Sequence, residues 1–213
     1  MDSIIFDLDG TLWDSRMAIC DIWKDVLSKH NAGKSEITLE EMKNSMGRQI
    51  HEIAAMYFPD LDEEFRMSLM NECCHIQTTY LAQYGGILYD NLESTLKELS
   101  KKYKLFIVSN CQDGYIEAFL TYHKLGKYFT DYECPGRTGL SKGENNKLII
   151  QRNNLKSPIY VGDTQGDADS AKFAQIPFVF AEYGFGNVSE YNYVIQQFKD
   201  LIDLDKKIRL SSI

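Results

Sequence analysis

Short apolar runs that alternate with helix-like stretches constrain the fold of this chain more than any other feature of its sequence. Four runs predict buried strands, and a weaker one lies at residues 128–133. Apolar residues between the runs recur at helical spacing, as in the helix predicted from Leu92, where Asp90 and Glu93 have the spacing of a capping box. This alternation is typical of an α/β fold with a parallel sheet, because parallel strands need long crossover connections. The four runs are residues 3–8, 104–109, 158–162 and 177–181, and residues 191–204 predict a closing strand and helix.

Residues 15–82 depart from this alternation and show helical periodicity throughout. Apolar residues such as Ile22 and Val26 recur at helical spacing there, and no convincing strand interrupts them. We therefore predict a helical domain at residues 15–82, inserted after the first strand of the sheet. Residues 1–14 and 83–213 then form the α/β core domain.

Two clusters of acidic residues follow predicted strands, at the edge where open α/β sheets bind ligands. Asp7 and Asp9 lie at the carboxyl end of the first strand, and Gly10 allows a sharp turn there. Asp163 and Asp167 follow the third strand and meet on one face if a helix begins between them. Carboxylates gathered at two strand ends repel one another unless a cation lies between them, and Mg²⁺ prefers such oxygen ligands. The alternative is a set of solvated acids at strand ends and at a capped helix start.

Three further polar residues fit the same edge of the sheet. Ser109 ends the second predicted strand, and Asn110 follows it. A hydroxyl group and backbone amides at a strand-to-helix junction are suited to holding phosphate oxygens. Lys142 lies just before another predicted helix. Taken singly, Ser109 is an ordinary turn or cap residue and Lys142 an ordinary surface charge.

Four motifs appear in a fixed order along the chain, each at the end of a predicted strand or the start of a helix. They are Asp7-Leu8-Asp9-Gly10-Thr11-Leu12, Val108-Ser109-Asn110, Lys142 and Gly162-Asp163-x-x-x-Asp167. In this ordered set the sequence resembles the haloacid dehalogenase-like hydrolase superfamily and, within it, the phosphoglycolate phosphatase-like group. The resemblance covers almost the whole chain, including the helical insert, which corresponds to a cap. It implies a Rossmann-like three-layer α/β core with a parallel sheet, and an α-helical cap domain inserted after the first strand.

The resemblance implies catalytic roles for Asp7, Asp9, Ser109 and Lys142. Asp7 attacks the phosphorus atom and forms an aspartyl-phosphate, which divides hydrolysis into two steps. Asp9 acts as general acid toward the leaving oxygen and then as general base for water. Ser109 and Lys142, with nearby backbone amides, neutralise charge on the transferring phosphoryl oxygens.

The resemblance also implies a metal site for Mg²⁺. Its predicted ligands are Asp7, Asp9 through the backbone carbonyl, and Asp163. Asp167 supports the metal or positions Lys142. Asp7 thus serves both as nucleophile and as metal ligand.

Substrate binding is predicted for Thr11 and Asn110 in the core and for Gly47 and Arg48 in the cap. Gly47 permits a close approach to the site, and Arg48 can grip a carboxylate or a second phosphate with two hydrogen bonds. The alternative for Arg48 is an exposed arginine at a helix start. A capped site suits a small substrate, such as phosphoglycolate, a sugar phosphate or a nucleotide monophosphate.

Asp9 and Gly143 narrow the reaction further. Dehalogenases that resemble this fold lack the second aspartate, and phosphonate-cleaving relatives usually carry a small residue there, so both of these reactions are disfavoured. Relatives that act on phosphoglycolate or hexose phosphates often have proline after the lysine of the third motif. Here Gly143 follows Lys142, which leaves the identity of the substrate open without affecting the chemistry.

Charge and cysteine content limit the possible partners and the cellular compartment of the protein. The chain of 213 residues has 31 acidic and 23 basic residues, a net charge of −8, which disfavours nucleic acid and anionic membranes as partners. No secretory signal and no apolar stretch of about 18 residues that could span a bilayer is seen. The five cysteines are an odd number without a C-x-x-C pair, so we expect free thiols in a reducing cytoplasm. We expect a monomer or a homodimer.

We therefore predict a cytoplasmic, Mg²⁺-dependent phosphomonoester hydrolase that acts on a small phosphorylated metabolite such as phosphoglycolate. One alternative is a sugar phosphomutase of the same superfamily, which would use Asp7 and Asp9 but return the phosphoryl group to the sugar. Product analysis would separate the two. The other alternative is a catalytically idle regulatory or binding protein on this fold, which would be expected to lack a nucleophile or metal ligand. None is missing here.

Overall fold

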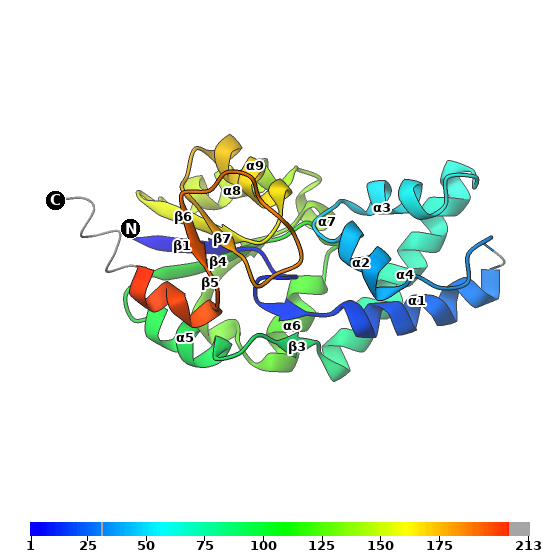
Figure 1. Ribbon diagram of the computed structural model, residues 1–213, viewed down its shortest axis with the longest axis horizontal. Coiled ribbons are helices and arrows are strands. Elements are labelled where there is room, and N and C mark those ends of the chain that lie inside the picture. Colours follow the sequence, from blue (N-terminus) through cyan, green and yellow to red (C-terminus); the bar gives the residue numbers. More distant parts are fainter. Residues whose placement is uncertain (31, 205–213) are drawn as a thin grey trace.

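A six-stranded parallel sheet forms the centre of the molecule (Figure 1). The structure is a computed structural model, and it describes residues 1–30 and 32–204. The strand order is β5-β4-β1-β6-β7-β8, and every pair of neighbours is parallel. The prediction of a parallel sheet is confirmed. The strands are β1 (Ser3–Phe6), β4 (Lys104–Val108), β5 (Phe129–Glu133), β6 (Pro158–Gly162), β7 (Phe178–Ala181) and β8 (Tyr193–Ile195).

The first strand is two residues shorter than the predicted run at residues 3–8. Asp7 N still donates to Val161 O at 2.8 Å, which extends the contact between β1 and β6 by one residue. Leu8 O then accepts from Leu12 N at 2.8 Å, so the chain turns instead of continuing the strand. The turn ends β1 and places the residues from Asp7 onward at the edge of the sheet.

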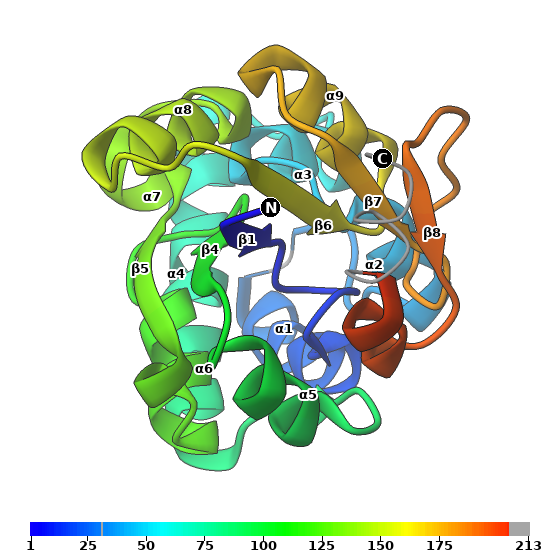
Figure 2. The ribbon, with the colours of Figure 1, turned by 90° about the vertical axis from the view of Figure 1, so that its left-hand side faces the viewer.

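Helices cover both faces of the sheet and give the three layers that the family resemblance implies. The helices α8 (Lys142–Arg152) and α9 (Gln165–Ala174) lie on one face, and α5 (Leu92–Leu99) and α6 (Tyr115–His123) on the other (Figure 2). Successive residues of β1 point to opposite faces, so Ile5 packs with the α8 and α9 side and Ile4 with the other. The 3-10 helix η2 (Phe198–Asp200) joins the α5 side.

Four helices follow β1 and form the insert, to the right of the sheet in Figure 1. The last of them runs to Tyr84, two residues beyond the predicted boundary of residues 15–82, and packs against α6 of the core. The division into two domains stays a prediction. The four helices are α1 (Arg16–His30), α2 (Leu39–Ser45), α3 (Ile50–Tyr57) and α4 (Glu63–Tyr84).

The two connections between core and insert are paired with each other. The short strand β2 (Trp13–Asp14) is antiparallel to β3 (Ile87–Leu88), and Gly85 ends α4 with a φ of 68°. Strands of two residues are too short to give a pattern in the sequence, and neither was predicted. Their pairing holds the two connections side by side.

The predicted capping box at the start of α5 is wrong. The N-cap residue is Asn91, in the left-handed conformation with a φ of 60°, and no side chain caps the helix. Glu93 accepts hydrogen bonds from Lys127 Nζ at 2.9 Å and Tyr128 Oη at 3.1 Å instead. Because these partners engage its carboxylate, Glu93 does not reach back to the helix start.

Within the described part of the chain, none of the helices is both long enough and apolar enough to cross a membrane. The five cysteines are free thiols, as predicted. The remaining short helices are η1 (Gly126–Tyr128) and α7 (Pro135–Thr138).

Candidate active site

The carboxyl ends of three neighbouring strands bring the predicted catalytic residues together. Asp7 follows β1, Ser109 follows β4 and Asp163 follows β6. Since β1 lies between β4 and β6, these side chains meet at one edge of the sheet. Asp7 is 2% exposed, Ser109 4% and Asp163 0%, so they are not the solvated acids and turn residues of the alternative interpretation.

Lys142 forms ion pairs with two of the carboxylates. Its Nζ lies 2.9 Å from Asp7 Oδ1 and 2.6 Å from Asp167 Oδ1. It is the first residue of α8, which Ser141 caps, and it is only 4% exposed. Burial alone would lower the pKa of Lys142, but Asp167 and Asp7 outweigh it and raise that pKa above its usual value. An ordinary surface lysine is thereby excluded.

Asp163 and Asp167 are fixed by hydrogen bonds from the loops around them. Asp163 accepts from Phe185 N at 2.7 Å and from Thr11 Oγ1 at 3.3 Å. Asp167 Oδ2 accepts from Thr164 N at 2.9 Å, within the capping box that starts α9. The orientation of both carboxylates is thus set by the protein.

Gly10 brings the chain close to Asp163. It has a φ of +80°, and a Cβ atom at this position would overlap the Asp163 carboxylate. A glycine is therefore required here both by the backbone conformation and by the space available.

The carboxylates of Asp7, Asp163 and Asp167 fit a magnesium ion. One oxygen atom from each can be chosen so that all lie within 4.8 Å of one another. Opposite ligands of Mg²⁺, each at about 2.1 Å from the ion, are about 4.2 Å apart, and the ion takes hard oxygen donors. Burial, with Asp167 adding to it and Lys142 opposing it, raises the pKa of Asp7 to about 6. The three acids exceed the single charge of Lys142, so the cluster attracts a cation.

Asp9 does not share this cluster; its carboxylate lies in a separate hydrogen-bond group. Asp9 Oδ1 accepts from Ser15 Oγ at 2.6 Å, and Tyr115 Oη lies 3.1 Å from the same oxygen. Burial raises the pKa of Asp9 to about 7, although the hydrogen bond from Ser15 opposes the shift. The Asp9 carboxylate is not part of the acidic group found among the described residues, so the predicted contact of Asp9 with the metal is the one through its backbone carbonyl.

Ser15 and Tyr115 are site residues that the sequence interpretation missed. Tyr115 is 106 positions from Asp9 and begins α6, where nothing in the local pattern separates it from a core aromatic residue. Ser15 is the first residue of the predicted insert, residues 15–82, and no role is predicted for it. A short polar residue six positions after Asp9 was the one available signal for it.

The insert closes over the site through the loop between α2 and α3. Asn110 Nδ2 donates to Gly47 O at 2.8 Å. Gly47 has a φ of +79°, and a Cβ atom there would lie 3.1 Å from Thr164 Oγ1. The loop thus touches the core beside Ser109 and beside Asp163, and a chamber of about 370 Å³ lies between insert and core.

Six of the predicted site residues line the chamber, namely Asp7, Asp9, Gly47, Arg48, Ser109 and Asn110. The side chain of Arg48 is exposed, and its Nε lies 3.4 Å from Asn44 O. The other four, Thr11, Lys142, Asp163 and Asp167, lie outside the lining and are buried.

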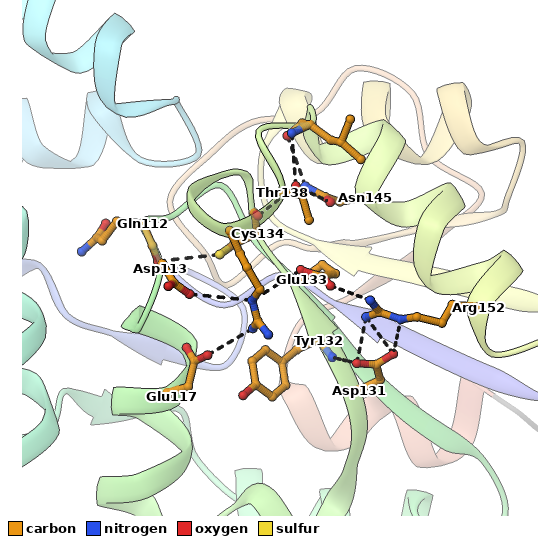
Figure 3. Close-up of polar contacts among 12 residues, drawn as sticks. Gln112, Asp113, Glu117, Asp131, Tyr132, Glu133, Cys134, Thr138, Asn145 and Arg152 are labelled. Carbon is orange, nitrogen blue, oxygen red and sulfur yellow. Dashed lines mark hydrogen bonds and ion pairs between the residues drawn. The ribbon is translucent and has the colours of Figure 1, made fainter.

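The segment after β5 forms a further wall of the chamber. Cys134 Sγ lies 3.7 Å from Gln112 O, and Gly136 N donates to Cys111 O at 3.0 Å. Arg137 reaches three acids of the neighbouring segments, and Arg152 Nη1 donates to Glu133 Oε1 at 2.7 Å. Figure 3 shows these acids, Asp113, Glu117 and Glu133, around the start of α7. The wall is therefore held to the segment that follows Ser109.

Comparisons with known proteins agree with this architecture. A model of the family described as haloacid dehalogenase-like hydrolase matches residues 4–181. The chain is 24% identical over 219 residues to a phosphoglycolate phosphatase from Photobacterium profundum, with 95% of each protein covered.

Solved structures show the same fold at low identity. A haloacid dehalogenase-like hydrolase from Streptococcus pneumoniae has a TM-score of 0.84 at 18% identity, with 96% of this chain and 98% of that chain covered. A structure described as a predicted phosphoglycolate phosphatase from Haemophilus somnus has a TM-score of 0.83 at 19% identity, with the same coverage.

Proposed function

The chain belongs to the haloacid dehalogenase-like hydrolases, and from this premise we propose that it is a Mg²⁺-dependent phosphomonoester hydrolase. The predicted membership in the phosphoglycolate phosphatase-like group is confirmed, as is the prediction of a phosphatase enzyme. We propose as its substrate a small phosphorylated metabolite, for which the names of the relatives suggest phosphoglycolate.

One observation carries the proposal: a buried aspartate lines the chamber between insert and core, held by a lysine and beside two further carboxylates. Lys142, Asp163 and Asp167 lie next to Asp7, outside the lining of the chamber. A nucleophile placed between a fixed cation and a metal site is the arrangement that phosphoryl transfer needs, because positioning and charge neutralisation supply most of its catalysis.

Asp7 attacks the phosphorus atom of the bound ester through one of its carboxylate oxygens. Lys142 holds the other side of this carboxylate and neutralises charge on the phosphoryl oxygens, together with the Ser109 hydroxyl and the amides that follow it. The product of this step is an aspartyl-phosphate and the free alcohol.

Asp9 acts as general acid and general base. Its carboxylate lies apart from the metal cluster, held by Ser15 and Tyr115 at the chamber wall. It donates a proton to the leaving oxygen and later accepts one from the water that cleaves the aspartyl-phosphate.

The residues proposed to hold Mg²⁺ are Asp7, Asp163 and the backbone carbonyl of Asp9. When bound, the ion neutralises charge on the phosphoryl group and on Asp7. Asp167 positions Lys142 through the 2.6 Å ion pair and completes the acidic cluster. Thr11 donates to Asp163, which supports a positioning role more than direct contact with substrate.

The insert acts as a cap that excludes water during the first step. Gly47 and Asn110 join it to the core, and Arg48 is proposed to contact substrate at the rim of the chamber. The free thiols agree with a reducing cytoplasm, where we place the enzyme. The mutase alternative uses the same residues and differs in its product.

The experiment is the release of inorganic phosphate from a panel of small phosphate esters, with Mg²⁺ and with excess chelator. We expect release that depends on the metal and is lost in Asp7→Asn, which keeps the size of the side chain. Retained activity in a folded Asp7→Asn protein would refute the role of Asp7 as the nucleophile. Isomerised sugar phosphate in place of free phosphate would establish the mutase.

A further inference from the structure

The chamber continues from Asp7 into the cap, where it ends on a wall built from α1 and α4. Gln77 of α4 and Trp23 of α1 are both buried there and both line the chamber. Resting on the proposed function, we infer that the leaving group is neutral and carries hydroxyl groups, so that the substrate is a sugar or polyol phosphate. In this inference Gln77 and Gln112 bind the hydroxyl groups.

The orientation of the Gln77 amide is fixed by Trp23. The indole Nε1 can only donate, and it donates to Gln77 Oε1 at 2.6 Å. The Nε2 group of Gln77 therefore keeps both of its N–H donors, and no acceptor among the described residues takes them. Because Gln77 lines the chamber, a ligand or water there can accept these hydrogen bonds.

Gln112 presents the opposite half of its amide. Its Nε2 donates to Thr78 Oγ1 at 2.9 Å and lies 3.4 Å from Cys74 O, both on α4. Its Oε1 is left as an acceptor, and no donor among the described residues reaches it. Gln77 and Thr78 are neighbours in the chain and so face different directions on α4. The chamber is thus lined by one amide with free donors and, at another place, by an amide with a free acceptor.

The hydroxyl groups of a polyol match both amides, because a hydroxyl can accept a hydrogen bond at one place and donate one at another. A carboxylate only accepts, so it would leave Gln112 Oε1 without a donor. A carboxylate would also need a cation, since burying an unpaired charge is far more costly than burying a hydroxyl. Among the described residues that line the chamber, the one Lys or Arg is Arg48, and its side chain is exposed.

The rest of the chamber suits the carbon skeleton of a sugar. Apolar side chains, including Trp23, Met42 and Ile53, stand between the polar groups. The volume of about 370 Å³ falls within the range of small-molecule sites and exceeds what a two-carbon acid requires. The inference thus narrows the proposed class of substrates and moves it away from phosphoglycolate.

The test compares kcat/KM for four esters with the intact protein and Mg²⁺. The esters are ribose 5-phosphate, glucose 6-phosphate, phosphoglycolate and hexyl phosphate, which has the length of a hexose phosphate but no hydroxyl groups on its chain. We expect at least one sugar phosphate to exceed both phosphoglycolate and hexyl phosphate by about tenfold or more, because sites built for hydroxyl groups reject analogues that lack them.

Three results would contradict the inference. If kcat/KM were highest for phosphoglycolate, the chamber would be one that binds a carboxylate. If kcat/KM for hexyl phosphate equalled that for the best sugar phosphate, the chamber would be one that binds only an apolar group. Either result would refute the sugar or polyol phosphate as substrate and would leave the proposed hydrolase function intact. No phosphate release from any ester would overturn the proposed function and this inference with it.

A variant links the preference to the amide wall. Gln77→Leu removes the donors, and we expect kcat/KM for the preferred sugar phosphate to fall about tenfold further than that for hexyl phosphate. Gln151→Leu, at an exposed position of α8, is the matched control and should leave all four values unchanged. An equal loss for every ester in a folded Gln77→Leu protein would refute the role of Gln77.

Discussion

Replacing Lys142 by methionine tests the charge balance at the centre of the site. The side chain keeps its length but loses the ammonium group, whose Nζ bonds Asp7 Oδ1 at 2.9 Å and Asp167 Oδ1 at 2.6 Å. Hydrogen bonds between charged groups contribute about 1.5–3 kcal/mol each, so two of them give about 3–6 kcal/mol. Removal of one partner from a buried ion pair costs about 3–5 kcal/mol, in agreement with this sum.

The assay is urea unfolding in excess chelator, followed by circular dichroism, with the wild type alongside. We expect the free energy of unfolding of Lys142→Met to fall by about 3–5 kcal/mol. We also expect Mg²⁺ to restore part of the loss, because a cation then lies among the three carboxylates. Lys172→Met, at an exposed position of α9, is the control and should stay within about 0.5 kcal/mol of the wild type. A loss below about 1 kcal/mol for Lys142→Met would refute the buried triad as the source of the effect.

Three further variants test other parts of the account. Gly10→Ala should lower both phosphate release and the melting temperature, because the added Cβ would overlap Asp163. The control is Gly33→Ala, at a φ of +76° with nothing within 4 Å, which should show only the backbone strain of about 1–3 kcal/mol, and equal effects of the two substitutions would refute the steric argument. Burial lowers the pKa of His123 in the folded protein, so the neutral imidazole stabilises the fold above pH 6.5 and this stabilisation is lost as the pH falls below 6.5. In urea unfolding, His123→Phe should therefore become more stable relative to the wild type as the pH falls from 7 to 5, and a constant difference in stability would contradict this. Arg137→Met should lower the free energy of unfolding by about 1–2 kcal/mol, since Arg137 pairs with three acids, and an unchanged value would show that the wall needs no such support.

Much of the core could be predicted from the sequence because its strands are short apolar runs buried on both faces. The run at residues 158–162 coincides with β6, and the run at residues 104–109 with β4 to within one residue. The acidic residues that follow β1 and β6 could be placed at one sheet edge by topology alone. Their burial and the two ion pairs of Lys142 required the structure, because a single lysine before a helix has no local pattern that distinguishes it.

The residues that could not be predicted act across long distances in the chain. Tyr115 contacts Asp9 through the packing of α6, and Gln77 contacts Trp23 through the packing of α4 on α1. Tyr115, Gln77 and Trp23 lie within helices, where no local pattern marks them as residues of the site. The start of α5 shows a different cause, because Glu93 found partners on a neighbouring segment that outcompete the local capping box.

The central claim is that Asp7 is the nucleophile, and trapping the covalent intermediate tests it most directly. The enzyme would be mixed with substrate and Mg²⁺, quenched rapidly in acid and reduced with borohydride, which converts an aspartyl-phosphate into homoserine. Peptide mass spectrometry then identifies the residue at position 7 as aspartate or homoserine. The account predicts homoserine at position 7 that depends on substrate, and it would be contradicted by reduction at another carboxylate or by continued turnover with an unmodified Asp7.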